Sequence, residues 1–190
     1  LYMNKAVALF NIGRQPLEKG MNILGAHIDS PRMDIKQNPL YEKEDMAYFD
    51  THYYGGIKKY QWVTLPLAIH GVVAKKNGDV VDINIGEDKN DPVFCVTDLL
   101  IHLAGNQMEK KASKVIEGEE LDILFGSIPL KDTEKEAVKA NVLELIKDKY
   151  GMKEEDFISA ELEVVPAGAA RDFGLDSSMI MAYGQDDRVC

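Results

Sequence analysis

The pair Asn77-Gly78 is the feature that most constrains how this chain folds, because it separates two strand-like runs. Residues 61–75 before it read QWVTLPLAIHGVVAK, and residues 79–86 after it read DVVDINIG. Both Asn and Gly tolerate the positive φ angles that a tight β-hairpin requires. The sequence therefore predicts an antiparallel strand pair here.

Other segments have the apolar or alternating patterns that are typical of strands. They are residues 5–12, 21–29, 33–35, 121–130 (strand and turn) and 161–165. A polar and aromatic stretch with two tyrosines precedes Gly55-Gly56, which interrupts regular structure.

Two helices are predicted. Residues 97–108 form the first, and the second opens at Thr133, because Thr133-x-x-Glu136 has the form of a capping box. Gly151 ends it after a last turn with two lysines, which suits the helix dipole. Its apolar stripe consists of Val138, Val142, Leu145 and Ile146.

The composition limits the functional classes. With 190 residues, the chain can build one good core or two small ones. A net charge of −10 argues against nucleic acid, which needs a basic face. No apolar run approaches the ~18 residues of a membrane span, and the start lacks the pattern of a signal peptide. Cys95 and Cys190 fit no zinc or redox spacing, so we expect reduced thiols in a cytoplasmic protein.

The stretch NILGAHIDSPRMDI contains the first candidate site, His27 and Asp29. In a strand, residues i and i+2 point to the same face, so both side chains could converge where the strand ends. A neutral histidine is a good ligand for a divalent metal, and a neighbouring carboxylate can fix its tautomer. The alternative is an ordinary histidine that is hydrogen-bonded at a strand end.

Two further candidates have equally plain alternatives. Asp186 and Asp187 are adjacent carboxylates, of which one could bind a metal while the other points away; they could equally form a solvated acidic turn. If residues 97–108 are helical, Asp98 and His102 are i, i+4 neighbours and can pair, which could be a surface ion pair only.

The remaining reactive side chains are weaker candidates. His70 alternates with apolar neighbours and is interpreted as structural, and His52 lies in a polar, aromatic loop. Ser30 and Cys190 have no convincing base nearby, so a nucleophilic triad is unsupported.

Four ordered motifs resemble the aspartyl aminopeptidase family of cocatalytic metallo-aminopeptidases. They are GAHIDSPRMDIKQNP (25–39), DTHYYGGIKKYQW (50–62), LLIHL (99–103) and GQDDR (184–188). The resemblance implies that His27 is a metal ligand, that Asp29 orients it and that Asp186 bridges two divalent metal ions, zinc in the first place, with manganese or cobalt as alternatives. It also implies that His102 reaches into the site of a neighbouring subunit, where it helps to bind the substrate or the oxyanion.

The resemblance also implies an α/β fold in which part of a metallo-aminopeptidase catalytic domain is interrupted by a β-rich α+β dimerisation insertion. Residues 1–35 and 170–190 would be catalytic-domain sequence, and 36–169 the insertion. The expected partners are peptide substrates and further copies of the chain, which form dimers and then a tetrahedral dodecamer.

The sequence departs from the family pattern in two places. The paired glutamates and later ligands of the family follow the bridging aspartate, so we expect this chain to be an N-terminal segment that is inactive alone. After Trp62, neutral residues (VTLPL) stand where acidic-substrate members often have Asp-Arg-Asp, so the resemblance does not imply an acidic preference. The alternatives are a non-catalytic assembly module and another zinc amidohydrolase.

Overall fold

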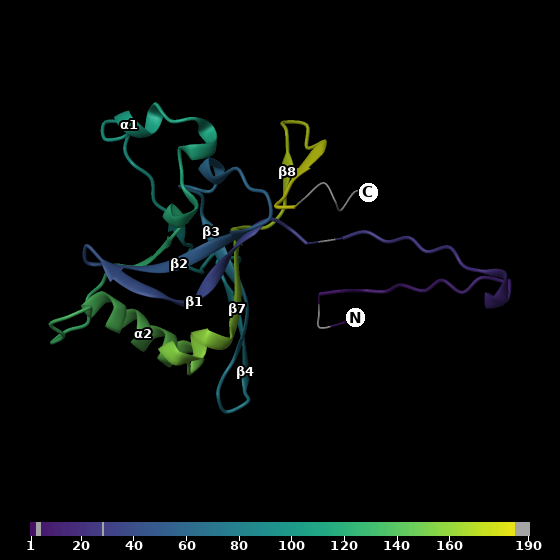
Figure 1. Cartoon of the computed structure of the whole chain (residues 1–190), viewed down its shortest axis with the longest axis horizontal. Helices are drawn as coiled ribbons and strands as arrows, with labels where there is room; N and C mark the ends of the chain where they lie inside the picture. Colours follow the sequence, from purple (N-terminus) through teal and green to yellow (C-terminus); the bar gives the residue numbers. More distant parts are fainter. Residues whose placement is uncertain (3–4, 28, 185–190) are drawn as a thin grey trace. The chain divides into compact units, whose positions relative to one another are not determined.

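The computed structural model describes residues 1–2, 5–27 and 29–184 (Figure 1). Contacts between Cα atoms divide these residues into two units, residues 1–27 and residues 29–184. Each unit is described by itself below.

The N-terminal unit has little regular structure among its described residues. It contains the 3₁₀ helix η1 (Leu17–Lys19) and one isolated bridge, in which the Tyr2 N–H donates to the Ala6 carbonyl over 2.8 Å. The strands predicted at 5–12 and 21–29 are therefore wrong. A strand needs a hydrogen-bonded neighbour, and the described part of this unit supplies none to these segments. Their apolar side chains are accordingly exposed, Leu24 to 98%.

The second unit is built on one antiparallel sheet. Among the described residues it has seven strands in the order β4-β3-β7-β1-β2-β6-β5, and each strand is antiparallel to its neighbours. This confirms the prediction of a β-rich region, whereas the ribbon β8-β9 was not predicted. The strands are β1 (Arg32–Lys43), β2 (Met46–Tyr54), β3 (Leu67–Ala74), β4 (Val80–Ile85), β5 (Cys95–Val96), β6 (Ile123–Gly126), β7 (Ala160–Pro166), β8 (Arg171–Phe173) and β9 (Met179–Met181).

The predicted Asn-Gly hairpin is confirmed as the β3–β4 pair, whose last partners are Ala74 and Val80. Gly78 has a φ of +92°, and the Asp79 N–H donates to Asn77 Oδ1 over 3.1 Å. The run does not begin at residue 61 as predicted. Residues Lys59–Gln61 form the 3₁₀ helix η2, and Thr64 has a left-handed φ of +62°, which a strand does not allow.

A second hairpin joins β1 to β2 through Glu44 and Asp45. These residues have φ angles of +51° and +56°, the conformation of a type I′ turn, although neither is the Asn or Gly that usually occupies it. The polar and aromatic stretch before Gly55 is therefore strand, and His52 lies in β2 rather than in a loop.

Helix α2 (Ala137–Tyr150) is shorter than predicted at its start. The capping box at Thr133 is wrong: its hydroxyl donates to the Lys131 carbonyl, and Glu136 has a left-handed φ of +46°. The C-terminus agrees with the prediction, because Gly151 has a φ of +61° and its N–H donates to the Lys147 carbonyl. Of the predicted stripe, Val138, Val142 and Ile146 are buried and Leu145 is 60% exposed.

The helix predicted over 97–108 is reduced to α1 (Gly105–Met108). Residues 97–100 have no regular structure and 101–103 form a turn. The remaining short elements are the 3₁₀ helices η3 (Ala112–Lys114), η4 (Gly118–Glu120) and η5 (Glu154–Ser159).

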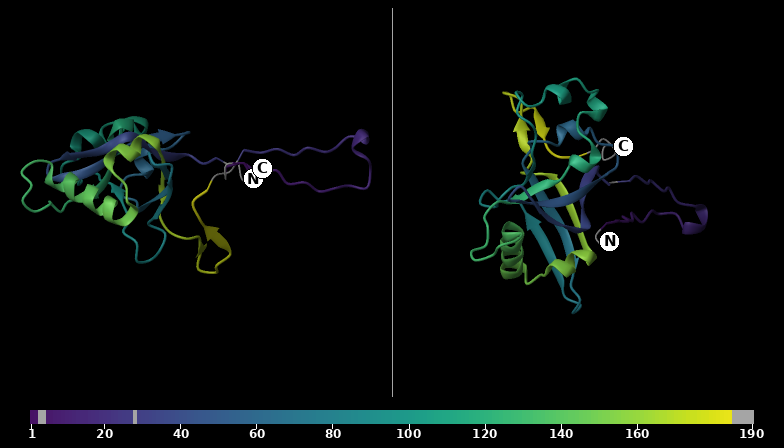
Figure 2. Two further views of the ribbon diagram at one scale, coloured as in Figure 1. Left: turned by 90° about the horizontal axis from the view of Figure 1, so that it is seen from below. Right: turned by 60° about the vertical axis from the view of Figure 1, so that its left-hand side comes forward.

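The core lies between the sheet and α2, which runs along one face of it (Figure 2). Phe49 is its centre: its ring stacks on Phe125 with centroids 4.0 Å apart and meets Phe157 edge-on at 5.3 Å. Within the described ranges, no helix has both the length and the apolar content needed to cross a membrane.

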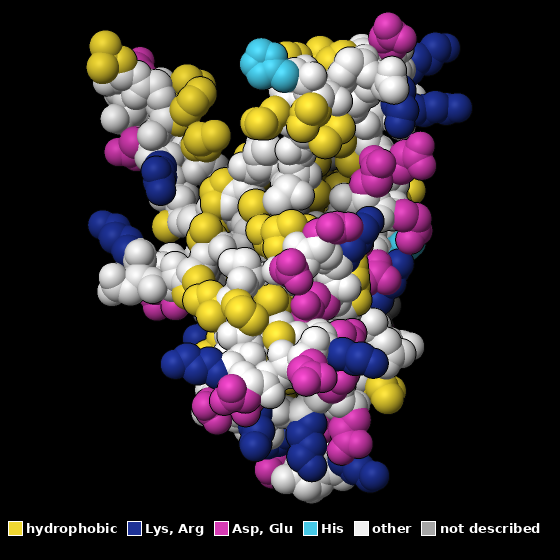
Figure 3. Space-filling model, turned by 90° about the vertical axis from the view of Figure 1, so that its left-hand side faces the viewer, with side chains coloured by type: hydrophobic (Ala, Val, Ile, Leu, Met, Phe, Trp, Pro, Cys, Tyr) yellow, Lys and Arg dark blue, Asp and Glu magenta, His cyan; other side chains and the backbone are white. Residues whose placement is uncertain are grey.

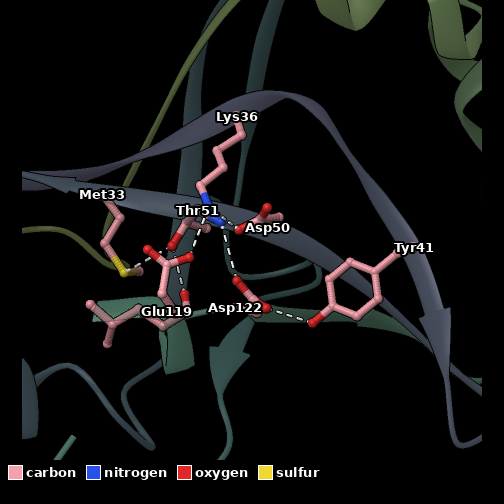
Figure 4. A network of polar contacts seen from close by, with 8 residues as sticks. Met33, Lys36, Tyr41, Asp50, Thr51, Glu119 and Asp122 are labelled. Carbon is pink, nitrogen blue, oxygen red and sulfur yellow. Dashed lines mark hydrogen bonds and ion pairs between the residues drawn. The ribbon is translucent and has the colours of Figure 1, made fainter. Parts of the chain in front are cut away.

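A polar network lies across β1, β2 and the segment before β6 (Figure 4). The Tyr41 hydroxyl donates to Asp122 Oδ2 over 2.5 Å, and the Thr51 N–H donates to Asp122 Oδ1 over 3.3 Å. Lys36 Nζ lies 2.8 Å from Asp50 and 3.2 Å from Glu119. Burial raises the pKa of Asp122, and the bond to Asp50 raises the pKa of Lys36.

Candidate functional site

The predicted carboxylate Asp29 lies three residues before β1 and is exposed. Its Oδ2 atom accepts a hydrogen bond from the Tyr54 hydroxyl at the end of β2, over 3.2 Å. His27 belongs to the N-terminal unit, where it is exposed and lies outside regular structure. The strand geometry that predicted a shared face for the two side chains is therefore not formed.

The ring of Tyr54 is fixed from below by Arg32. The two residues are directly opposite in the β1–β2 register, and the guanidinium carbon lies 4.2 Å from the ring centroid. Arg32 Nε in turn lies 2.8 Å from Asp34 Oδ1 and 3.2 Å from Glu163 Oε1. Sequence reasoning missed both residues. The Tyr-Gly-Gly segment was noted only as a motif, and the charge pattern around Arg32 has no local signature.

The two ends of the second unit meet at Pro31. The Tyr183 hydroxyl donates to the Pro31 carbonyl across 152 residues of sequence. The ring of Tyr183 also meets Trp62 edge-on, with centroids 6.3 Å apart, and Trp62 is buried. The segment after Asp29 and the segment before Gln185 are therefore neighbours. Asp186, Asp187 and Cys190 lie outside the described residues.

His102 lies in the turn 101–103 and is exposed. Because no helix forms there, Asp98 does not pair with it as predicted. Asp98 Oδ1 accepts instead from Gln107 Nε2 over 2.9 Å. Its apolar neighbours are exposed, with Leu100 at 71% and Leu103 at 70%. Figure 3 shows hydrophobic side chains gathered on a face that also carries many mixed charges.

The other histidines have structural contacts. His70 Nε2 lies 2.8 Å from Glu87 Oε1, and Glu87 Oε2 also accepts from the Gly168 N–H over 3.3 Å. This agrees with the interpretation of His70 as structural. The His52 ring stacks on Tyr53, with centroids 5.5 Å apart.

The described residues supply only part of a metal site. No group of three His, Cys, Asp or Glu side chains that could hold a metal ion is found in residues 1–2, 5–27 and 29–184. A catalytic zinc takes three protein ligands and a water molecule. An imidazole and a carboxylate, as in His27 and Asp29, are donors of the right kind but too few, so no catalytic step is derived from them.

Comparisons with known proteins identify the class. The model of the aminopeptidase I zinc metalloprotease family (M18) matches residues 2–190. A probable M18 family aminopeptidase 1 of Clostridium acetobutylicum is 66% identical over 187 residues, which cover 98% of this chain and 40% of that protein. The corresponding Thermotoga maritima protein is 53% identical over 186 residues, which cover 98% of this chain and 41% of that protein.

Solved structures give the same result for the fold. The crystal structure of aminopeptidase I from C. acetobutylicum has a TM-score of 0.86 at 66% identity and covers 94% of this chain and 40% of that one. That of the T. maritima M18 aminopeptidase has a TM-score of 0.87 at 54% identity and covers 92% and 38%. The S. cerevisiae mApe1 dodecamer shares the fold at a TM-score of 0.52 and 15% identity, covering 82% and 33%.

These matches define the class of protein as a zinc metalloprotease. The chain belongs to the aminopeptidase I family, M18. It spans about 40% of the length of the relatives named above, so its fold is a fragment of the M18 fold, made here mainly of antiparallel sheet.

Proposed function

We propose that the full-length protein that contains this chain is a zinc aminopeptidase, which hydrolyses the N-terminal peptide bond of its substrates. The observation that carries the proposal is the match of the family model to residues 2–190. The alternative of a non-catalytic assembly module has no comparable support.

In this proposal His27 is a ligand of one metal ion and Asp29 holds its imidazole in the ligating orientation. Asp186 bridges two metal ions, and the further ligands come from outside the described residues. Two metal ions held close together activate a shared water molecule and polarise the scissile carbonyl. The support for His27 and Asp29 is the chemistry of the pair and their place in the GAHIDS motif.

We further propose that residues 36–169 form an insertion in the catalytic domain and that this insertion builds dimers. The continuous antiparallel sheet, of which most strands lie in 36–169, supports an independent folding unit there. Assembly of six such dimers into a dodecamer is supported by the fold shared with the mApe1 dodecamer. His102, in an exposed turn of the insertion, is then able to serve a neighbouring subunit.

The test is metal binding and peptidase activity of His27→Ala in the full-length protein. We expect zinc content to fall and hydrolysis of aminoacyl-anilides to be lost. The matched control is His52→Ala, which removes another exposed imidazole that stacks on Tyr53; its zinc content should equal that of the wild type. Full zinc content and activity in His27→Ala would overturn the assignment.

A second measurement addresses this chain itself. Because its described residues gather fewer than three metal donors, we expect residues 1–190 alone to hydrolyse no aminoacyl-anilide. Hydrolysis by the purified chain that a chelator abolishes would contradict this expectation. A panel of acidic and neutral aminoacyl substrates on the full-length protein then measures the residue preference.

A further inference from the structure

Asp29 is linked by a specific hydrogen bond to a residue 25 positions further along the chain. The Tyr54 hydroxyl donates to its Oδ2 atom over 3.2 Å. Both residues belong to the second unit, and the bond joins the segment before β1 to the end of β2. Asp29 therefore has its orientation influenced by the sheet as well as by its own backbone.

The tyrosine is itself held in place on several sides. Its backbone is the register partner of Arg32, and the Arg32 guanidinium covers one face of its ring at 4.2 Å. The arginine side chain is only 17% exposed and is fixed by Asp34 and Glu163. A planar guanidinium held by two carboxylates provides a rigid support for the ring. The hydroxyl is thus presented to Asp29 from a preorganised position.

The turn after Tyr54 reinforces this arrangement. Gly55 has a φ of +75°, and a Cβ atom at this position would lie 3.5 Å from Pro31. The ends of β1 and β2 are therefore packed together beside Asp29, at the place where the Tyr183 hydroxyl also reaches the Pro31 carbonyl.

We propose that Tyr54, supported by Arg32, is a positioning residue that orients Asp29 toward its histidine partner and so strengthens metal binding. The inference rests on the proposed function, in which Asp29 orients the ligand His27. Partners of this outer kind fix a ligating histidine, and removing one typically costs 10–100-fold in metal affinity or activity. A hydrogen bond with a structural role only would leave metal affinity unchanged.

The experiment replaces Tyr54 by Phe in the full-length protein, which removes the hydroxyl and keeps the ring over Arg32. We expect zinc affinity, measured by chelator competition, to fall about 10-fold, while the melting temperature of the zinc-free protein is unchanged. The matched control is Tyr53→Phe, because the next residue of the same strand points to the other face, where its ring contacts His52 and Lys59. Zinc affinity of this control should equal that of the wild type.

A double-mutant cycle separates positioning from general damage. In an Asp29→Ala background, Tyr54→Phe should lower zinc affinity no further, because its target is gone. Arg32→Lys, which keeps the charge but not the planar support, should lower zinc affinity less than Tyr54→Phe. Additive effects of Tyr54→Phe and Asp29→Ala would overturn the inference.

The same series distinguishes this inference from the proposed function. If His27→Ala loses zinc while Tyr54→Phe binds it as tightly as the wild type, the positioning role alone is wrong. If His27→Ala keeps its zinc, the ligand assignment is wrong and Tyr54 has no histidine to position through Asp29.

Discussion

Glu42 caps helix α2 from a strand, through a bond to Val138 that spans 96 residues of sequence. Its Oε2 atom accepts hydrogen bonds from the backbone N–H groups of Val138 and Lys139, over 3.0 and 2.9 Å. The first turn of a helix has N–H groups without intrahelical acceptors, and a carboxylate there also interacts favourably with the helix dipole. The cap thus couples the start of α2 to the sheet it packs on.

Replacing Glu42 by Ala should lower the free energy of unfolding by about 1–2 kcal/mol, the usual cost of losing a side-chain cap. Urea denaturation of the chain measures this. Glu42→Gln keeps an acceptor oxygen and should recover part of the loss. The control is Glu144→Ala, which removes an exposed carboxylate in the middle of the same helix. A similar loss in both Ala variants would show that the effect is not capping.

The raised pKa of Asp122 predicts a specific pH dependence. Burial raises this pKa above its ordinary value of 3.8, and the neighbouring Asp50 raises it further, against the bonds from Tyr41 and Thr51. Folding therefore favours the protonated carboxyl. The corresponding stabilisation is fully present below pH 3.8 and is lost as the pH rises through the folded-state pKa.

Asp122→Asn should remove this loss, so that the variant gains stability relative to the wild type as the pH rises above 3.8. Unfolding free energies measured from about pH 3 to 7 test the prediction. Exposed Asp88→Asn removes the same charge and serves as the control. Parallel curves for the wild type and Asp122→Asn would contradict it.

Gly71 lies where β3 is closely approached by β7. A Cβ atom there would lie 1.9 Å from the Glu161 carbonyl oxygen, and its φ of +145° is unfavourable for other residues. Gly71→Ala should therefore destabilise the chain by about 3 kcal/mol or more, through steric overlap and backbone strain. Gly78→Ala is the control, because this glycine also has a positive φ but faces open space; its cost should be about 1 kcal/mol. Thermal unfolding of both variants measures the difference.

His102→Ala tests the proposed role between subunits. In the full-length protein we expect turnover of an aminoacyl-anilide to fall by about 100-fold or more, as when an oxyanion donor is lost. Zinc content should be unchanged, because His102 is not a proposed ligand. Loss of zinc would place His102 at the metal instead, and unchanged turnover would remove it from the site.

Local patterns predicted those features whose cause is local. The Asn77-Gly78 hairpin and the end of α2 at Gly151 both follow from residues that accept a left-handed backbone at the position itself. The order of four motifs also predicted the family that matches residues 2–190. By contrast, the β1–β2 turn uses Glu44 and Asp45, and such residues do not announce a type I′ turn.

Tertiary contacts decided the rest. Residues 21–29 have a strand pattern but find no partner within the described chain, and a strand forms only when a neighbour takes its hydrogen bonds. The start of α2 depends on Glu42, the orientation of Asp29 on Tyr54, and the meeting of the unit's two ends on Tyr183 and Pro31. These partners are 96, 25 and 152 residues apart, far beyond the span of any local periodicity. The sequence by itself determined the turns, the helix end and the family. The folded sheet decided which side chains support the candidate site, because only packing brings such distant groups within hydrogen-bonding distance.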